Sequence, residues 1–177
     1  MQTLGSSAVA IRAITPEDRA GLGRFYAGLS AESLELRFHG GMPRVGDATT
    51  HYFCLPDHRR REGLVAEVVN GEGRRTIVGH LCIEPVGSSQ PDTAEIAVVV
   101  ADEWQRRGVG RALLAAAIDW AGQHGFSRLT ASLLWGNAPM LNLIRSTGRP
   151  VAFGASGAGT LEAVLDVQAA VAAPRAA

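Results

Sequence analysis

Apolar and polar positions follow two different periods along the chain. Seven short runs have strand character: the first alternates between apolar and polar residues, and the others are short apolar runs bounded by turn residues. These runs lie at residues 9–14, 63–69, 75–85, 94–100, 128–134, 151–155 and 160–167. The dipeptide Asn70-Gly71, between the second and third runs, is a strong hairpin signal. The second to fourth runs therefore predict an antiparallel meander.

A helical period replaces the strand pattern after the fourth run. Apolar residues recur at positions 113, 114, 117, 118 and 121, which places them on one face of a helix over 110–125. Three shorter helices are predicted to follow the capping residues Thr15, Ser30 and Asn137, over 15–29, 30–40 and 137–148. Residues 40–50 are expected to form a glycine-rich loop, and the pattern at 50–61 favours no element.

The order of these elements indicates the fold class. The helix at 110–125 separates two predicted strands, which makes a strand–helix–strand crossover after the meander. We therefore expect one α/β (α+β) domain with a mixed, mostly antiparallel sheet. A length of 177 residues suits a single domain. The domain is predicted to span 9–167, with a flexible N-terminus at 1–8 and a mobile, low-complexity tail at 168–177.

Charge and cysteine content limit the binding partners and the cellular compartment that we expect. The 17 arginines balance the 17 aspartates and glutamates, and the chain has no lysine, so we expect no nucleic-acid partner, and any binding charge must be local. Cys54 and Cys82 are too few for a disulfide framework. The N-terminus lacks signal-peptide features, and no apolar run approaches the ~20 residues of a membrane span. These features predict a cytoplasmic protein without a membrane partner.

The stretch WQRRGVGRALL, from residue 104 to 114, joins a predicted strand to the long predicted helix. The first N–H groups of a helix have no internal partner and carry partial positive charge. Gly108 and Gly110 would let an anion approach them, and Arg106, Arg107 and Arg111 add formal charge. The pattern is neither a dinucleotide fingerprint nor a P-loop. It indicates either a phosphate site or a structural turn with exposed arginines.

The same residues resemble a known family. QRRGVGRALL resembles the Q/R-x-x-G-x-G/A motif of the GNAT acetyltransferase superfamily, and the predicted element order over 9–167 is also that of the family. The resemblance implies the GNAT fold, with helices on both faces of the sheet and a splayed cofactor cleft. Residues 11–38 and 94–114 are similar to the acetyltransferase domain of bacterial Pat-type protein lysine acetyltransferases.

The resemblance implies an activity. The expected reaction is transfer of an acetyl group from acetyl-CoA to a primary amine, by direct attack in a ternary complex. A protein lysine is the first expectation for the acceptor. A small-molecule amine acetyltransferase and a non-catalytic acetyl-CoA-binding sensor or partner module are the alternatives. A monomer and a homodimer are equally compatible with the sequence.

The resemblance also implies roles for individual residues. Glu95 matches the catalytic glutamate of the Pat type, and its strand position predicts apolar neighbours around a base that deprotonates the acceptor. The alternative is a strand-end glutamate that faces water or pairs with an arginine. The backbone of Val98, Val99 and Val100 is expected to pair with the pantetheine arm. Asn137 is expected to contact the cofactor or to cap a helix. The pyrophosphate loop would consist of Gln105, Arg106, Arg107, Gly108, Val109, Gly110 and Arg111.

Two positions depart from the family pattern. Ile144 stands where many members have a tyrosine that protonates the leaving thiolate, and Arg149 stands where an aromatic residue is usual. We expect Arg149 to change a pocket wall or a partner surface. The five histidines lack ligand spacing, so no metal is predicted. The segments with the weakest pattern, 40–61 and 135–155, are expected to determine the acceptor; Trp135 is expected to pack or to contact substrate.

Overall fold

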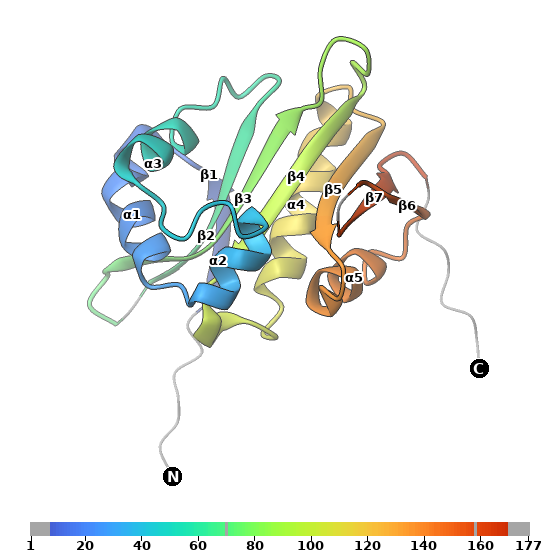
Figure 1. The fold of residues 1–177 in the computed structure, drawn as a ribbon. Coiled ribbons are helices and arrows are strands. Elements are labelled where there is room, and N and C mark those ends of the chain that lie inside the picture. Colours follow the sequence, from blue (N-terminus) through green and yellow to red (C-terminus); the bar gives the residue numbers. More distant parts are fainter. Residues whose placement is uncertain (1–7, 70, 158, 170–177) are drawn as a thin grey trace, which may run out of the picture.

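The computed structural model describes residues 8–69, 71–157 and 159–169. Its centre is one seven-stranded sheet with the strand order β1-β2-β3-β4-β5-β7-β6 (Figure 1). The strands are β1 (Val9–Ala13), β2 (Glu62–Val69), β3 (Arg75–Pro85), β4 (Thr93–Val100), β5 (Arg128–Leu134), β6 (Val151–Ala155) and β7 (Thr160–Asp166). The predicted segments 1–8 and 168–177 lie outside the described residues, except for residues 8, 168 and 169.

Helices cover both faces of the sheet. The helices are α1 (Arg19–Ala27), α2 (Ala31–Phe38), α3 (Asp47–Phe53), α4 (Val109–Gln123) and α5 (Ala138–Arg145). In Figure 1, α1, α2 and α3 lie on one face of the sheet and α4 on the other. Single 3₁₀ turns, Pro16–Asp18 and Asp102–Trp104, precede α1 and the loop before α4. The predicted fold class is therefore confirmed.

Each face of the sheet has its own core. One cluster packs α4 against the sheet through Leu113, Leu114 and Ala117, and Ile144 of α5 belongs to the same cluster. The other cluster packs α1 and α2 against the opposite face, with Tyr26 among its buried residues. The apolar positions that predicted the long helix are the ones that α4 buries.

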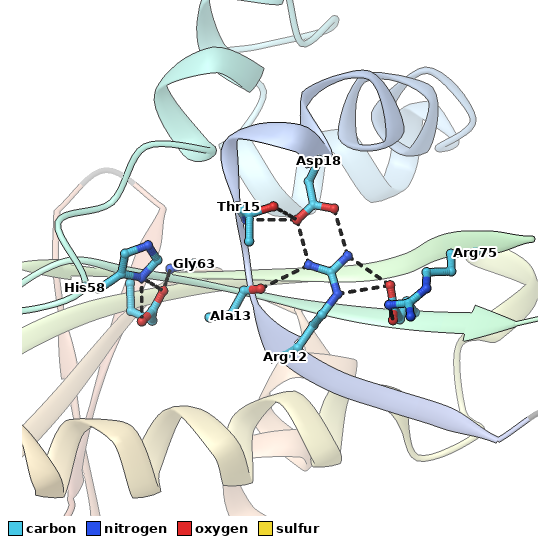
Figure 2. Close-up of polar contacts among 9 residues, drawn as sticks. Arg12, Ala13, Thr15, Asp18, His58, Gly63 and Arg75 are labelled. Carbon is cyan, nitrogen blue, oxygen red and sulfur yellow. Dashed lines mark hydrogen bonds and ion pairs between the residues drawn. The ribbon is translucent and has the colours of Figure 1, made fainter.

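A charged network attaches the start of α1 to the sheet (Figure 2). Arg12 on β1 donates to both carboxylate oxygens of Asp18, at 2.7 and 2.8 Å, and to Glu67 on β2, at 2.9 and 3.0 Å. Glu67 is buried and also accepts from Arg75, at 2.9 Å. Asp18 further accepts from the backbone N–H of Thr15. The pKa of Asp18 is lowered, chiefly because Arg12 donates to its carboxylate.

Neighbouring strands are antiparallel except β4 and β5, which are parallel. The parallel pairing has only three residue pairs, Thr93 with Arg128, Ala94 with Leu129 and Glu95 with Thr130. Beyond Glu95, β4 continues to Val100 and β5 to Leu134 without pairing to each other. The two strands therefore separate just after Glu95.

The structure confirms each predicted strand to within a residue at either end, and the four predicted helices within a few residues. It adds one helix, α3, in a region where we predicted a loop and an undefined segment. This helix has seven residues, too few for a clear period of 3.6, and no side chain caps its N-terminus. No helix among the described residues is long and apolar enough to cross a membrane.

Candidate active site

The N-terminus of α4 presents unpaired backbone N–H groups. Gly108 is the N-cap residue, with φ +86°, and no side chain caps the helix. The first turn of a helix then has free N–H groups and partial positive charge. A Cβ atom added at Gly108 would meet no atom within 4 Å, so the space beside the N-cap is open. This geometry fits an anionic group such as a pyrophosphate.

The two glycines of the motif have different surroundings. A Cβ atom at Gly110 would lie 3.4 Å from Leu143 on α5 and 3.8 Å from Val100 on β4. These are ordinary contact distances, so the Gly110 position faces packed neighbours that a methyl group would only touch, whereas Gly108 provides the left-handed backbone and the open space. Val109 is buried in the core, so only its backbone can face a ligand. The expectation that both glycines open the anion site stays a prediction, which the open space favours at Gly108 more than at Gly110.

Charged side chains surround this helix N-terminus. Arg106, Arg107 and Arg111 are exposed, and none of the ion pairs formed within the described ranges involves them. Arg106 itself adopts a left-handed backbone, with φ +57°, and Arg107 lies over the ring of Trp104. Three uncompensated guanidinium groups therefore surround the free N–H groups.

Gln105 hydrogen-bonds this loop to α2 and β4. Its side-chain nitrogen donates to the Val100 carbonyl at 3.1 Å and to the Ser33 hydroxyl at 3.0 Å. Asp102 accepts from the Ser30 backbone and from both serine hydroxyls. Burial opposes ionisation of Asp102, but these hydrogen bonds outweigh it, and the pKa of Asp102 is lowered. The start of α2 is thus fixed to the end of β4.

The backbone of β4 faces the gap between β4 and β5 at alternate residues. The Ala101 N–H donates to the Val78 carbonyl on β3. Because peptide groups alternate in direction along a strand, the N–H and C=O groups of the odd-numbered residues of β4, including Val99, hydrogen-bond to β3. Val98 and Val100 then point toward β5, where no strand pairs with them. The Val100 carbonyl already accepts from Gln105. Of the three valines expected to bind the pantetheine arm, Val98 has both its N–H and its C=O directed into the gap without a strand partner.

Glu95 lies at the point where β4 and β5 separate, on the face that carries α1, α2 and α3. Its side chain is exposed, which agrees with the alternative that this glutamate faces water. The physical reason is that the gap between the strands begins here and leaves this part of the face uncovered. Glu95 pairs directly across the strands with Glu84 on β3. A base in this position can reach water and an incoming acceptor.

Sequence reasoning missed the groups beside Glu95. Arg61 donates to both oxygens of Glu84, at 2.6 and 3.0 Å, and its guanidinium lies 4.1 Å from the ring centre of Tyr52. Asp57 accepts from the backbone N–H groups of 59, 60 and 61, which lower its pKa to about 2. An Asp followed by a basic run is the local signal for this turn. Nothing local indicates that Arg61 contacts Glu84.

A buried polar cluster lies further along the same face, between α1, α2 and β3. His80 is fully buried, hydrogen-bonds to the Tyr26 hydroxyl at 2.8 Å, and has its pKa lowered to about 3 by burial. Burial also raises the pKa of Tyr26. Arg37 donates to Cys82 at 3.5 Å, and its Nε atom is buried without a partner. His80 is thus neutral and serves packing rather than proton transfer at ordinary pH.

The remaining predicted residues have structural contacts. Asn137 caps α5, because its side-chain oxygen accepts from the Met140 N–H at 3.1 Å. Ile144 is buried in the core. Arg149 donates to the carbonyls of Val167 and Ala169, both at 2.6 Å, so it braces the end of β7 rather than lining a pocket. Trp135 is 65% exposed and does not pack. No group of three or more potential metal ligands occurs among the described residues.

A sheet that separates between two parallel strands, beside an uncapped glycine-rich helix N-terminus, fits the coenzyme A-dependent acyltransferase class that the motif at residues 105–114 predicts. The model of the acetyltransferase (GNAT) family matches residues 30–148, more than half of the chain. The chain therefore belongs to the GNAT acetyltransferase family, and its acceptor is an amine. No curated protein is significantly similar in sequence.

Solved structures share this fold. The GNAT domain of S. lividans PAT is 26% identical, with a TM-score of 0.78 over 94% of this chain and 99% of that one. The putative acetyltransferase yncA from Salmonella typhimurium, solved with its cofactor acetyl-CoA, is 21% identical, with a TM-score of 0.71 over 96% and 99% of the chains. Ribosomal-protein-alanine N-acetyltransferase from Brucella melitensis is 24% identical, with a TM-score of 0.66 over 88% and 97%.

Proposed function

We propose that this acetyltransferase transfers the acetyl group of acetyl-CoA to the side-chain amine of a protein lysine. The observation that carries the proposal is the exposure of Glu95 at the point where β4 and β5 separate. An exposed base suits an acceptor that is presented on a macromolecule, whereas an enclosed base would suit a metabolite. The similarity to the GNAT domain of S. lividans PAT, at 26% identity, supports the same conclusion.

The residues of the chain fit acetyl-CoA at two places. The open space at Gly108, the free N–H groups of α4 and the surrounding arginines would hold the pyrophosphate. The free peptide groups of Val98 would pair with the pantetheine arm, and its N–H would stabilise charge that develops on the thioester oxygen. When bound, acetyl-CoA supplies an activated acetyl group as a thioester. The Asn137 side chain caps α5 and lies near the end of β5, where it would add a cofactor contact.

Glu95 would supply the base. A lysine ammonium has a pKa of about 10.4 and cannot attack until it loses a proton. Glu95, or a water bound to it, accepts that proton. The amine nitrogen then forms the C–N bond as the C–S bond breaks, the electron pair leaves on sulfur, and the nitrogen gives its second proton to that thiolate or to water. Because a thiol has a pKa of roughly 8.5, the thiolate can leave without the tyrosine that Ile144 replaces.

We further propose a cytoplasmic location. Cys54 and Cys82 are both free and buried, which suits a reducing compartment.

The proposal is tested by measuring stability and turnover together. Acetyl-CoA and coenzyme A should each raise the melting temperature of the purified protein, because both bind only the folded state. Acetylation of a whole-cell protein extract, read by mass spectrometry, is then compared with a panel of small amines. Modified lysines at rates above those of the panel are the expected result. Turnover confined to small amines would assign a metabolite acceptor, and binding without turnover would assign a sensor.

A further inference from the structure

Two carboxylates face each other across β3 and β4 at the point where β4 and β5 separate. Glu84 and Glu95 are direct cross-strand partners, and their side chains share the face that carries α1, α2 and α3. The Ala101 N–H bonds the Val78 carbonyl. Counting back by twos makes Glu84 and Glu95 a hydrogen-bonded pair as well, with Cα atoms about 5.5 Å apart. Like charges directly opposite each other destabilise a sheet, so this arrangement needs a reason.

One cation compensates only one of the two acids. Arg61 donates hydrogen bonds to Glu84 from two of its nitrogen atoms. The side chain of Arg61 is 23% exposed and that of Glu84 is 34% exposed. The Tyr52 hydroxyl donates to the same carboxylate at 3.4 Å. Within the ranges that the structure describes, no ion pair reaches Glu95. The pair therefore keeps a net negative charge beside the gap between the strands.

The position of Arg61 is set before any acceptor arrives. Its backbone N–H donates to Asp57 at 2.9 Å, its guanidinium lies over Tyr52, and Tyr52 lies at the end of α3. A bidentate, stacked guanidinium fixes both the place and the plane of the carboxylate that it holds. Glu84 is thus pre-organised, while the exposed Glu95 keeps its freedom to move.

We propose that Glu84 is an acceptor-binding carboxylate, which receives the ammonium group of the acceptor together with Glu95, and that Arg61 is its positioning residue. This inference rests on the proposed acetyl transfer to an amine. Each carboxylate oxygen has two lone pairs, so Glu84 can accept from an ammonium while Arg61 still donates to it. An ammonium has three N–H donors, enough to contact both acids at once.

The two acids then have different parts in the reaction. One ammonium proton passes to Glu95, the nitrogen lone pair forms the C–N bond, the C–S bond breaks, and sulfur takes the electron pair. The nitrogen then gives a second proton to the coenzyme A thiolate or to water, which leaves the neutral amide. Glu84 stays ionised throughout and holds the N–H group that remains. Two acids also select the acceptor: an alkylammonium without a neighbouring carboxylate, such as a lysine side chain, is favoured over the α-amine of a free amino acid.

The test separates amine binding from a merely structural ion pair. With a peptide that carries one lysine, Glu84→Gln should raise KM about ten- to hundredfold, the effect of one lost hydrogen bond to a charged group. Its kcat should change less than about threefold, and its affinity for coenzyme A should stay unchanged. Asp47→Asn is the matched control, since it breaks another Arg–carboxylate pair, with Arg19, away from the gap. That variant should keep the wild-type KM.

The exchanged pair R61E/E84R is the decisive variant. It restores the ion pair and should restore the melting temperature, but it places a cation where the ammonium must bind, so KM should stay high. Recovery of the wild-type KM would overturn the inference. Binding of n-butylamine to the complex with coenzyme A, followed by NMR, needs no turnover and no protein acceptor. Equal affinity of wild type and Glu84→Gln would also overturn it, whereas loss of affinity supports it even if the acceptor is not a protein.

Discussion

The substitution Gly108→Ala tests the anion site at the N-terminus of α4. Gly108 has φ +86°, a region that costs an L-residue about 1–2 kcal/mol. No atom lies within 4 Å of the added methyl group, so no clash adds to this cost. For a chain of this length, about 1 kcal/mol lowers the melting temperature by about 2–4 °C. We therefore expect a loss of about 2–8 °C.

The effect on cofactor binding should exceed the effect on stability. The methyl group would occupy the open space beside the free N–H groups and keep the pyrophosphate from at least one of them. Hydrogen bonds to charged groups contribute about 1.5–3 kcal/mol, which corresponds to a roughly ten- to hundredfold rise in the Kd for coenzyme A. Calorimetric titration with coenzyme A and with acetyl-CoA measures the change in Kd, and thermal unfolding without ligand measures the change in melting temperature.

Gly110→Ala is the matched control, two residues further on. Gly110 lies inside α4, and its added Cβ would make ordinary contacts with Leu143 and Val100. Alanine favours a helix by about 0.8–1.0 kcal/mol over glycine. The melting temperature should stay the same or rise, and the Kd should change less than about threefold. The reasoning is refuted if Gly108→Ala binds coenzyme A as tightly as the wild type, or if Gly110→Ala weakens binding equally.

Three further variants test the base, the cap and the buried charge. Glu95→Gln should lower kcat at least tenfold and leave the Kd for coenzyme A unchanged; a full rate in a stopped assay would exclude Glu95 as the base. Asn137→Ala should cost about 1 kcal/mol in denaturant unfolding, from loss of the α5 cap. Any added loss of cofactor affinity would identify a contact. Arg12→Met should cost about 3 kcal/mol, since it leaves the buried Glu67 with Arg75 alone. Arg12 also lowers the pKa of Asp18, so the ion pair with Asp18 contributes part of this stability. That contribution should be present above the ordinary carboxyl pKa of about 4 and lost as pH falls through the lowered pKa of Asp18. A pH-independent cost in unfolding titrations would contradict it.

Much of the fold was predictable, because its signals are local. The strand over Arg75–Pro85 and the buried face of α4 follow from residues that are neighbours in sequence. The glycine-rich turn before α4 and the cap at Asn137 are local as well. The missed helix α3 has seven residues and no capping side chain, so its sequence contains no clear period. Where the period was long enough, the prediction was confirmed.

The candidate site was predictable only in part. Sequence identified Glu95, the glycine-rich turn and the valines of β4, and it could not separate Gly108 from Gly110 or Val98 from Val99. Those differences depend on what packs beside each residue: Leu143 comes from α5, and the partner of Val99 comes from β3. The exposure of Glu95 also depends on the tertiary structure, because it is set by where β5 turns away from β4.

The sequence by itself determined the elements, their order and the glycine-rich turn before α4, because hydrophobic period, caps and turn residues act over a few neighbouring positions. Only the tertiary structure decided that β4 and β5 separate after three residue pairs, and that Arg61, Glu84 and Glu95 meet at that point. These three residues come from a loop and two strands. Their distances depend on strand register and on the hairpins between them, and no local pattern in the chain encodes that geometry.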